Sequence, residues 1–155
     1  MYKIVIIISV IALLTSCGND IETDVNNVVP IQDAKVSDKI SEFKTINGLL
    51  KKDVNNAGLY LRRANLYTKY DDLSSAISDL DRALKIDSLQ PEFYLLKAEL
   101  LKKQDKLKES KEVLDQCMHV DNNNIKARIE LGWLALISRN HKQALDYADA
   151  VLKRD

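Results

Sequence analysis

The amino-acid sequence repeats itself with a period of 34 residues. Three blocks begin at Ala57, Pro91 and Ile125, and no insertion interrupts the period. Within the blocks, apolar and small residues recur three and four positions apart, as they do on one face of an amphipathic helix. The polar segments between these stretches, such as the one from Asp71, are short enough to force a tight antiparallel reversal. Such a chain builds a row of stacked helix pairs, because each pair buries its apolar face only against its neighbours.

Small or apolar residues occupy the same positions of the three blocks. They are Tyr60 and Tyr94 at the fourth position; Ala64, Ala98 and Gly132 at the eighth; Tyr67, Leu101 and Ala135 at the eleventh; Ala76, Ser110 and Ala144 at the twentieth; Leu80, Leu114 and Ala148 at the twenty-fourth; and Ala83, Cys117 and Val151 at the twenty-seventh. This pattern resembles the tetratricopeptide repeat, a pair of antiparallel helices. The resemblance covers residues 57–155 and implies an all-α solenoid, in which repeats 57–90, 91–124 and 125–155 stack into a right-handed superhelix with a concave and a convex face.

Two basic residues depart from the family pattern. Arg63 and Lys97 stand at the seventh position, where the family usually has leucine. We expect their aliphatic stems to pack against the core while their charges reach water. We also expect the acid-rich stretch from Asp79 to Asp81 to lie on a solvated helix face.

One extra helix is predicted ahead of the three repeats. Its apolar positions with helical spacing are Ile40, Phe43, Ile46 or Asn47, and Leu50. They predict a helix over residues 37–52, within an N-terminal segment of residues 37–56. The sequence therefore predicts seven helices in the folded part of the chain.

The first residues have the order of a secretory signal peptide, with one positive charge, a largely apolar run from residue 4 to residue 14, and then small residues. The order Leu-Thr-Ser-Cys that ends at Cys17 resembles the bacterial lipobox. The resemblance implies cleavage between Ser16 and Cys17 and acylation of Cys17. An uncleaved membrane anchor is the alternative, but spanning a bilayer takes about twenty apolar residues. We therefore predict a lipoprotein signal peptide over residues 1–16.

Residues 17–36 have no sustained period and contain Pro30. We predict that this segment consists of the lipidated Cys17 and a flexible tether. The residue after Cys17 is Gly18 rather than aspartate, so the inner-membrane retention rule of enteric bacteria is not met. These features predict an envelope protein that its lipid holds at the outer membrane, on the periplasmic or the surface side.

Tetratricopeptide arrays bind peptides or protein segments in a groove lined by the first helix of each pair, so the resemblance implies a protein or peptide partner. The carboxylate clamp of some arrays is only partly matched. Asn65 and Lys126 fit it, but Leu61, Leu96 and Glu130 replace its other polar residues. We predict instead an apolar groove with a charged rim. The predicted groove residues are Arg62, Asn65, Lys69, Leu96, Glu99, Lys103, Glu130, Trp133 and Ile137.

Alternatives stay open for the apolar residues near this groove. Leu61, Leu95 and Ile129 share the fifth position of their repeats, and they also suit ordinary packing between repeats. Trp133 holds a position that usually faces the groove, and exposed tryptophans are frequent binding anchors. The alternative for Trp133 is that the tether or the first helix covers it.

No residues are predicted to catalyse a reaction or to hold a metal or a cofactor. Cys117 and His119 are two positions apart on a helix, so they point to opposite sides, and His141 is the only other histidine. Cys117 stands at a packing position, where we expect it to be buried. The 23 basic and 23 acidic residues balance, so no basic excess steers the chain to nucleic acid.

The predicted function is the binding or scaffolding of other proteins by a lipid-anchored envelope protein. The alternative is capture of a glycan or small ligand within a nutrient-uptake system, since some such lipoproteins are built on this repeat. On the last helix, Leu145, Ala148 and Leu152 form an apolar stripe. Either further repeats follow in a longer chain, or this edge associates with a second copy or with a partner.

Overall fold

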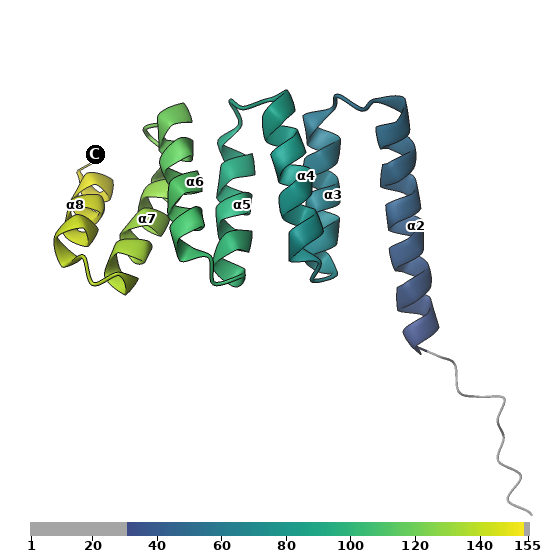
Figure 1. Ribbon diagram of the computed structural model, residues 1–155, viewed down its shortest axis with the longest axis horizontal. Coiled ribbons are helices and arrows are strands. Elements are labelled where there is room, and N and C mark those ends of the chain that lie inside the picture. The colour runs from purple at the N-terminus through teal and green to yellow at the C-terminus, as the bar shows by residue number, and fades with distance from the viewer. Residues whose placement is uncertain (1–30, 154–155) are drawn as a thin grey trace, which may run out of the picture. The chain divides into compact units, whose positions relative to one another are not determined.

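Seven α-helices follow one another between residues 31 and 153, the part of the chain that the computed structural model describes (Figure 1). They are α2 (Ile31–Lys52), α3 (Ala57–Lys69), α4 (Leu73–Ile86), α5 (Pro91–Lys103), α6 (Leu107–Val120), α7 (Ile125–Ile137) and α8 (His141–Leu152). No strand occurs in this part of the chain. The predicted all-α helical repeat fold is confirmed. The chain divides into two units, Met1–Ala34 and Lys35–Asp155, and the packing described below is that of the second unit.

The period of the sequence is also the period of the helix pairs. α3, α5 and α7 begin 34 residues apart, and so do α4, α6 and α8. Each pair turns at a residue with a positive φ, which is 60° at Asp71, 59° at Asp105 and 57° at Arg139. This left-handed conformation reverses the chain within a few residues, so the two helices of a pair lie side by side.

Side chains at the helix starts explain where the helices begin. Asn56 Oδ1 accepts a hydrogen bond from the amide of Leu59 at 3.2 Å, and Asn124 Oδ1 accepts one from Ala127 at 3.0 Å. α5 has no such cap and begins instead with Pro91, whose fixed φ suits the first turn of a helix.

α5 takes part in both hydrophobic clusters of the array. Leu100 is buried in the cluster formed with α3 and α4, whereas Leu101, the next residue, is buried in the cluster formed with α6 and α7. Small residues let paired helices approach closely, and Ala64 and Ala98 are accordingly buried. Cys117 is buried in the second cluster, as its repeat position predicts.

α2 begins earlier than the apolar pattern predicts. The prediction of a tether up to residue 36 is wrong for residues 31–36, which are helical. Pro30 directly precedes Ile31, the first residue of α2, and proline is common at helix starts, so it does not by itself indicate a tether. The predicted signal peptide, the cleavage site at Ser16, the lipidated Cys17 and the rest of the tether lie outside the described residues.

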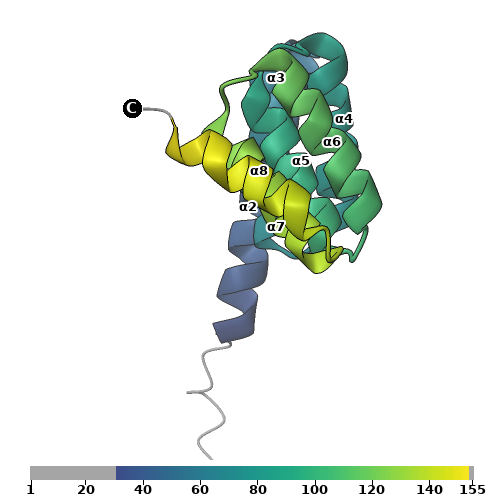
Figure 2. The ribbon, with the colours of Figure 1, turned by 90° about the vertical axis from the view of Figure 1, so that its left-hand side faces the viewer.

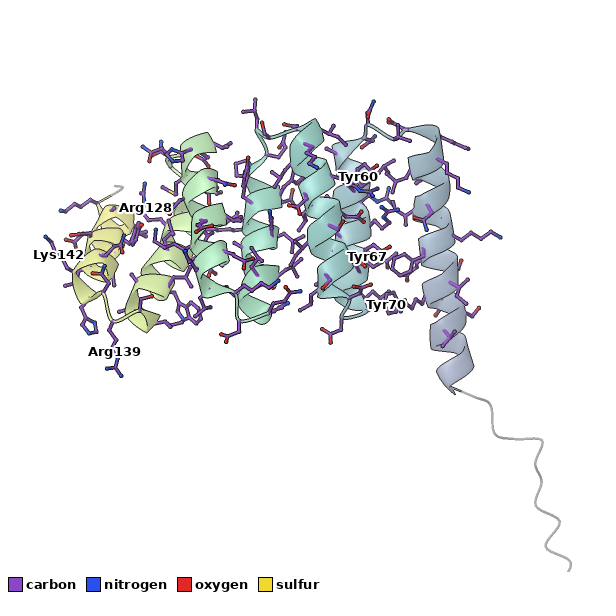
Figure 3. All side chains as sticks on the ribbon, in the orientation of Figure 1. Tyr60, Tyr67, Tyr70, Arg128, Arg139 and Lys142 are labelled. Atoms are coloured by element: carbon purple, nitrogen blue, oxygen red, sulfur yellow. The ribbon has the colours of Figure 1, made fainter. Side chains whose placement is uncertain are left out.

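Large side chains join α2 to α3. The ring of Phe43 lies against Tyr67, with centroids 4.8 Å apart, and its centroid is 5.9 Å from that of Tyr70. Figure 3 labels the two tyrosines, on the side of the array next to α2. Lys69 Nζ lies 2.7 Å from Glu42 Oε1, which adds an ion pair to the same contact. α2 therefore covers the first end of the array.

The turn after α2 matches the turns between the repeats. Asp53 Oδ2 accepts a hydrogen bond from Asn56 Nδ2 at 2.9 Å. After α6, Asp121 Oδ2 accepts the equivalent bond from Asn124 Nδ2 at 3.0 Å. α2 therefore holds the place of the second helix of a repeat.

Arg63 corrects two predictions from the sequence. Its Nε and Nη2 atoms donate to the two carboxylate oxygens of Asp79 at 2.6 and 2.7 Å, and Nη1 donates to Asn47 of α2 at 2.7 Å. The guanidinium is therefore held by groups of the protein rather than projecting into water, and Asp79, which is 3% exposed, does not lie on a solvated face. Hydrogen bonding to the Asp79 carboxylate raises the pKa of Arg63. Lys97 pairs in a similar way with Asp81, at 2.6 Å.

Candidate functional site: two grooves on the helix array

A groove crosses the first helices of the three pairs. It encloses about 350 Å³. Its lining residues are Asn65 of α3; Glu92, Leu95, Leu96, Ala98 and Glu99 of α5; and Lys126, Ile129 and Glu130 of α7. Three helices contribute to it because residues 34 apart occupy equivalent places in successive pairs. We call it the α3–α5–α7 groove.

Both signs of charge line the α3–α5–α7 groove. Glu99 is neutralised by Lys103, whose Nζ lies 2.9 Å from it, and Glu130 is neutralised by Lys102. Glu92 is exposed and forms no ion pair within the described range. The exposed Lys126 forms none there either. The groove thus offers one free carboxylate and one free ammonium group around a floor that contains leucine.

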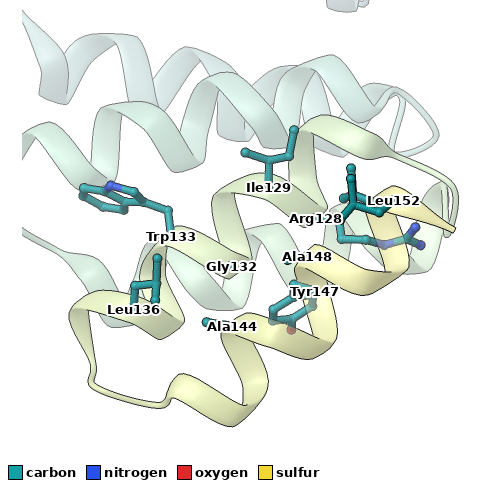
Figure 4. A pocket seen from close by; sticks show the side chains of 10 residues that line it. Arg128, Ile129, Gly132, Trp133, Leu136, Ala144, Tyr147, Ala148 and Leu152 are labelled. Carbon is teal, nitrogen blue, oxygen red and sulfur yellow. The ribbon is translucent and has the colours of Figure 1, made fainter. Parts of the chain in front are cut away.

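A second groove lies at the end of the array, between α7 and α8 (Figure 4). It encloses about 410 Å³. Its lining residues are Arg128, Ile129, Gly132, Trp133 and Leu136 of α7, and Ala144, Tyr147, Ala148, Val151 and Leu152 of α8. In the view from this end, α7 and α8 face the viewer and no other described helix lies over them (Figure 2). We call it the α7–α8 groove.

Comparison with known families agrees with this architecture. The sequence profile of the tetratricopeptide repeat (TPR) matches residues 57–88 and 91–124, which contain the pairs α3–α4 and α5–α6. Residues 57–88 and 91–124 therefore have the sequence pattern of this repeat. α7 and α8 follow with the same spacing and the same kind of turn, so they form a third pair of the same build. No curated protein sequence matches the chain.

Solved TPR structures share the fold of the array. MamA from Desulfovibrio magneticus RS-1 is 18% identical, with a TM-score of 0.65 over 77% of this chain and 68% of that one. YrrB, a TPR protein with an unusual peptide-binding site, is 21% identical, with a TM-score of 0.62 over 70% of this chain and 56% of its own. The first TPR of Spaghetti (RPAP3), bound to the HSP90 peptide SRMEEVD, is 19% identical, with a TM-score of 0.60 over 70% of this chain and 86% of its own. At these identities the likeness shows the fold alone.

The repeats bring part of the predicted groove together. Four of the nine predicted residues line the α3–α5–α7 groove, namely Asn65, Leu96, Glu99 and Glu130. Lys103 lies at its edge through the ion pair with Glu99. Glu92 was missed, although it stands 34 residues before Lys126 and so at the same repeat position. That equivalence was the signal that would have found it.

The other predicted groove residues lie elsewhere. Arg62 lines a separate depression beside α2, together with Glu42. Lys69 is held by its ion pair with the same Glu42. Trp133 lines the α7–α8 groove, and Ile137, which is exposed, lines neither of the two grooves. Repeat position alone misplaced Arg62 and Lys69 because it takes no account of α2.

The structure also separates the alternatives for the apolar residues. Leu61 and Leu95 are half-buried and pack on the two hydrophobic clusters, as inter-repeat packing requires. Ile129, at the equivalent position of the third pair, is 54% exposed. The described helices leave Trp133 46% exposed, with Lys102 Nζ 4.7 Å from its ring centroid.

Metal ligands, a reactive thiol and a membrane-spanning helix are other features that the described residues could supply. No cluster of three or more His, Cys, Asp or Glu side chains that could hold a metal ion occurs among them. Burial raises the pKa of the Cys117 thiol, which disfavours the reactive thiolate. None of the described helices is both long enough and apolar enough to cross a bilayer.

Proposed function

We propose that the protein is a lipid-anchored scaffold of the bacterial cell envelope that binds a segment of another protein in the α3–α5–α7 groove. The observation that carries this proposal is the groove itself, to which three successive first helices contribute. Leu95 and Leu96 are half-buried, so part of their apolar surface remains available to a ligand side chain. Glu92 and Lys126 supply charges of both signs beside that surface.

The charges of the groove indicate which segments fit. The RPAP3 repeat is bound to SRMEEVD, a peptide with an acidic end. Here, Glu92, Glu99 and Glu130 line the groove, and Asn65 and Lys126 alone do not balance a further pair of carboxylates. We therefore expect a segment that places an apolar side chain on the leucines and a basic side chain beside Glu92.

The proposed anchor rests on the sequence around Cys17. A lipoprotein cysteine carries more than one acyl chain, and several chains anchor a protein firmly where a single chain is marginal. Anchored at the outer membrane, on its periplasmic or surface side, the array meets partners that are themselves confined to the envelope. The glycan- or small-ligand-capture alternative is not favoured, because two of the similar proteins are described as binding peptides.

Charge reversal in the groove tests the proposal. Asn65 and Glu99 are exposed, so the double variant Asn65→Arg, Glu99→Arg makes the groove basic without disturbing the core. The full chain and this variant are each purified from detergent-solubilised membranes, and co-purifying proteins are quantified by mass spectrometry. We expect the variant to recover at least tenfold less of the partner.

The matched control is Glu109→Arg, Gln116→Arg, which makes the same charge changes at exposed positions of α6. This control should recover as much partner as the unmodified chain. Equal recovery by both variants, or the absence of any enriched protein, would overturn the proposal.

A further inference from the structure

Apolar side chains gather at the end of the array rather than only in the α3–α5–α7 groove. Leu136 is 55% exposed and Leu152 is 75% exposed, and both line the α7–α8 groove with Trp133. Large apolar patches of this kind on a soluble domain mark interaction surfaces. The first two helix pairs of the array show which kind of element packs on such a surface.

The first two helix pairs present the equivalent surface to the helix that follows them. Leu80 and Ala83 of α4 are fully buried beneath α5, and Leu114 and Cys117 of α6 are fully buried beneath α7. At the same two repeat positions of α8, Ala148 is exposed and Val151 is half-buried. The α7–α8 groove therefore corresponds to the surfaces that α5 and α7 cover in the first two pairs.

The covering helices share a spacing of apolar residues. α7 places Ala127, Leu131 and Leu134 into the cluster it forms with α5 and α6, which is an i, i+4, i+7 pattern. α5 contributes Phe93 and Leu100, seven residues apart, to the cluster with α3 and α4. An amphipathic helix that docks in an apolar groove is read from anchors with this spacing.

We propose that the α7–α8 groove binds one amphipathic helix of a partner protein, with apolar residues at i and i+7 and an acidic residue at one end. Gly132 and Ala148 stand where the second pair has the larger residues Ala98 and Leu114. The α7–α8 groove therefore has more room there and accommodates a large apolar side chain. The acidic residue of the partner would form an ion pair with Arg128, the one charged residue among those that line the groove. Arg128 donates to the carbonyl oxygens of Ala150 and Asn122 and forms no ion pair within the described residues.

A second copy of this chain fits the groove less well. Two such grooves placed face to face would each present Arg128 and no carboxylate to the other, so neither copy supplies the acidic residue. The large apolar residues that α2 exposes are Val36, Ile40 and Leu49. No two of them are seven residues apart, so α2 does not supply anchors at i and i+7. Self-association through the last helix is therefore an outcome of the test and not the proposal.

Trp133 reports on the test directly, because it is the single tryptophan of the chain. The probe is a synthetic peptide of residues 88–106, which contains the α5 sequence and no tryptophan. We expect this peptide to shift the Trp133 emission of the full chain to shorter wavelength in a saturable way. A peptide with Phe93→Glu and Leu100→Glu should give no saturable shift.

Two variants of the chain locate the binding. Leu152→Glu should weaken binding of the peptide at least tenfold, whereas Leu89→Glu, which is 73% exposed in the turn before α5, should leave it unchanged. Because Leu152 is also exposed, its variant keeps the core, and circular dichroism checks its folding. The groove variant Asn65→Arg, Glu99→Arg should bind the peptide normally, which separates this proposal from the proposed function.

Three results would overturn the inference. They are the absence of a saturable shift, equal binding by the Leu152→Glu variant, and a dimer of the full chain in sedimentation that Leu152→Glu dissociates. The last result would show that a second copy of the chain occupies the α7–α8 groove.

Discussion

A buried ion pair, rather than an apolar contact, lies where α2, α3 and α4 meet. The side chains of Arg63 and Asp79 are 16% and 4% exposed, and the two-pronged contact between them leaves neither charge unpaired. Asn47 adds a hydrogen bond from α2 to the same guanidinium. Such a pair stabilises the fold little more than a well-packed apolar pair would. Removal of one partner, however, leaves the other charge buried without a partner.

Asp79→Ala should therefore lower the free energy of unfolding by about 3–5 kcal/mol. Asp81→Ala removes the carboxylate that pairs with Lys97. Because the Asp81 side chain is 46% exposed, this change should lower the free energy of unfolding by less than about 1 kcal/mol. Urea unfolding followed by circular dichroism measures both values. Equal losses for the two variants would contradict the assigned role of the buried pair.

At the scale of the element, the same turn occurs three times with different side chains at the start of the second helix. Asp72 Oδ1 accepts a hydrogen bond from the Ser75 amide at 3.0 Å, and Asn140 Oδ1 accepts one from Gln143 at 3.2 Å. Lys106, at the equivalent position before α6, makes no side-chain cap. The first amide groups of α6 therefore have no side-chain cap.

Lys106→Asn should stabilise the protein by about 1 kcal/mol, because asparagine supplies the missing cap. Lys108→Asn makes the same exchange at an exposed position inside α6, where it adds no cap. Thermal unfolding distinguishes the two variants. A higher Tm for Lys108→Asn than for Lys106→Asn would contradict the capping argument.

The Asp72 cap also gives the helix pair a dependence on pH. Hydrogen bonds from the hydroxyl and then from the amide of Ser75 lower the pKa of Asp72 below its ordinary value of 3.8. The unfolded chain therefore binds a proton more readily, and the stabilisation present above about pH 4 is lost as the pH falls through the lowered pKa. Asp72→Asn keeps a cap but cannot titrate, so its stability should fall less steeply below pH 4. A slope equal to that of the wild type in acid urea titrations would refute this.

The sequence predicted helices well where the pattern was local. Starts at Ala57, Pro91 and Ile125 follow from caps and from apolar spacing within a few turns. It did not predict that Arg63 reaches Asp79, because that contact depends on how three helices face one another. In the candidate site, Leu96 and Glu99 line the groove that their repeat positions predict. Lys69 instead forms an ion pair with Glu42 of α2, and Arg62 lines a separate depression that includes Glu42, because α2 lies outside the repeat pattern.

At the scale of the whole molecule, the two ends of the array differ. α2 covers one end through Phe43 and the contacts of Glu42, whereas the α7–α8 groove leaves Trp133 and Leu152 exposed at the other. The α3–α5–α7 groove lies between them. Under the proposed function, the lipid on Cys17 fixes the protein to a membrane and the grooves are its binding surfaces.

Cys17→Ser tests the anchor. Without the thiol no thioether to a diacylglycerol can form, so we expect an unprocessed precursor that incorporates no labelled fatty acid. Electrophoretic mobility and palmitate labelling in cells measure both. Ser16→Ala is the matched control, because it keeps a small residue before the cysteine and should be processed normally. A Cys17→Ser chain that is still cleaved and labelled would disprove the lipobox reading.

Hydrogen–deuterium exchange of the full chain, with and without the partner that co-purifies with it, tests the central claim most directly. Binding in the α3–α5–α7 groove predicts slower exchange in Pro91–Lys103 and Ile125–Ile137, the first helices that line it. The second helices α4 and α6 should change little. Protection confined to α4 and α6, or no protection in α5, would contradict the claim that this groove is where the protein binds its partner.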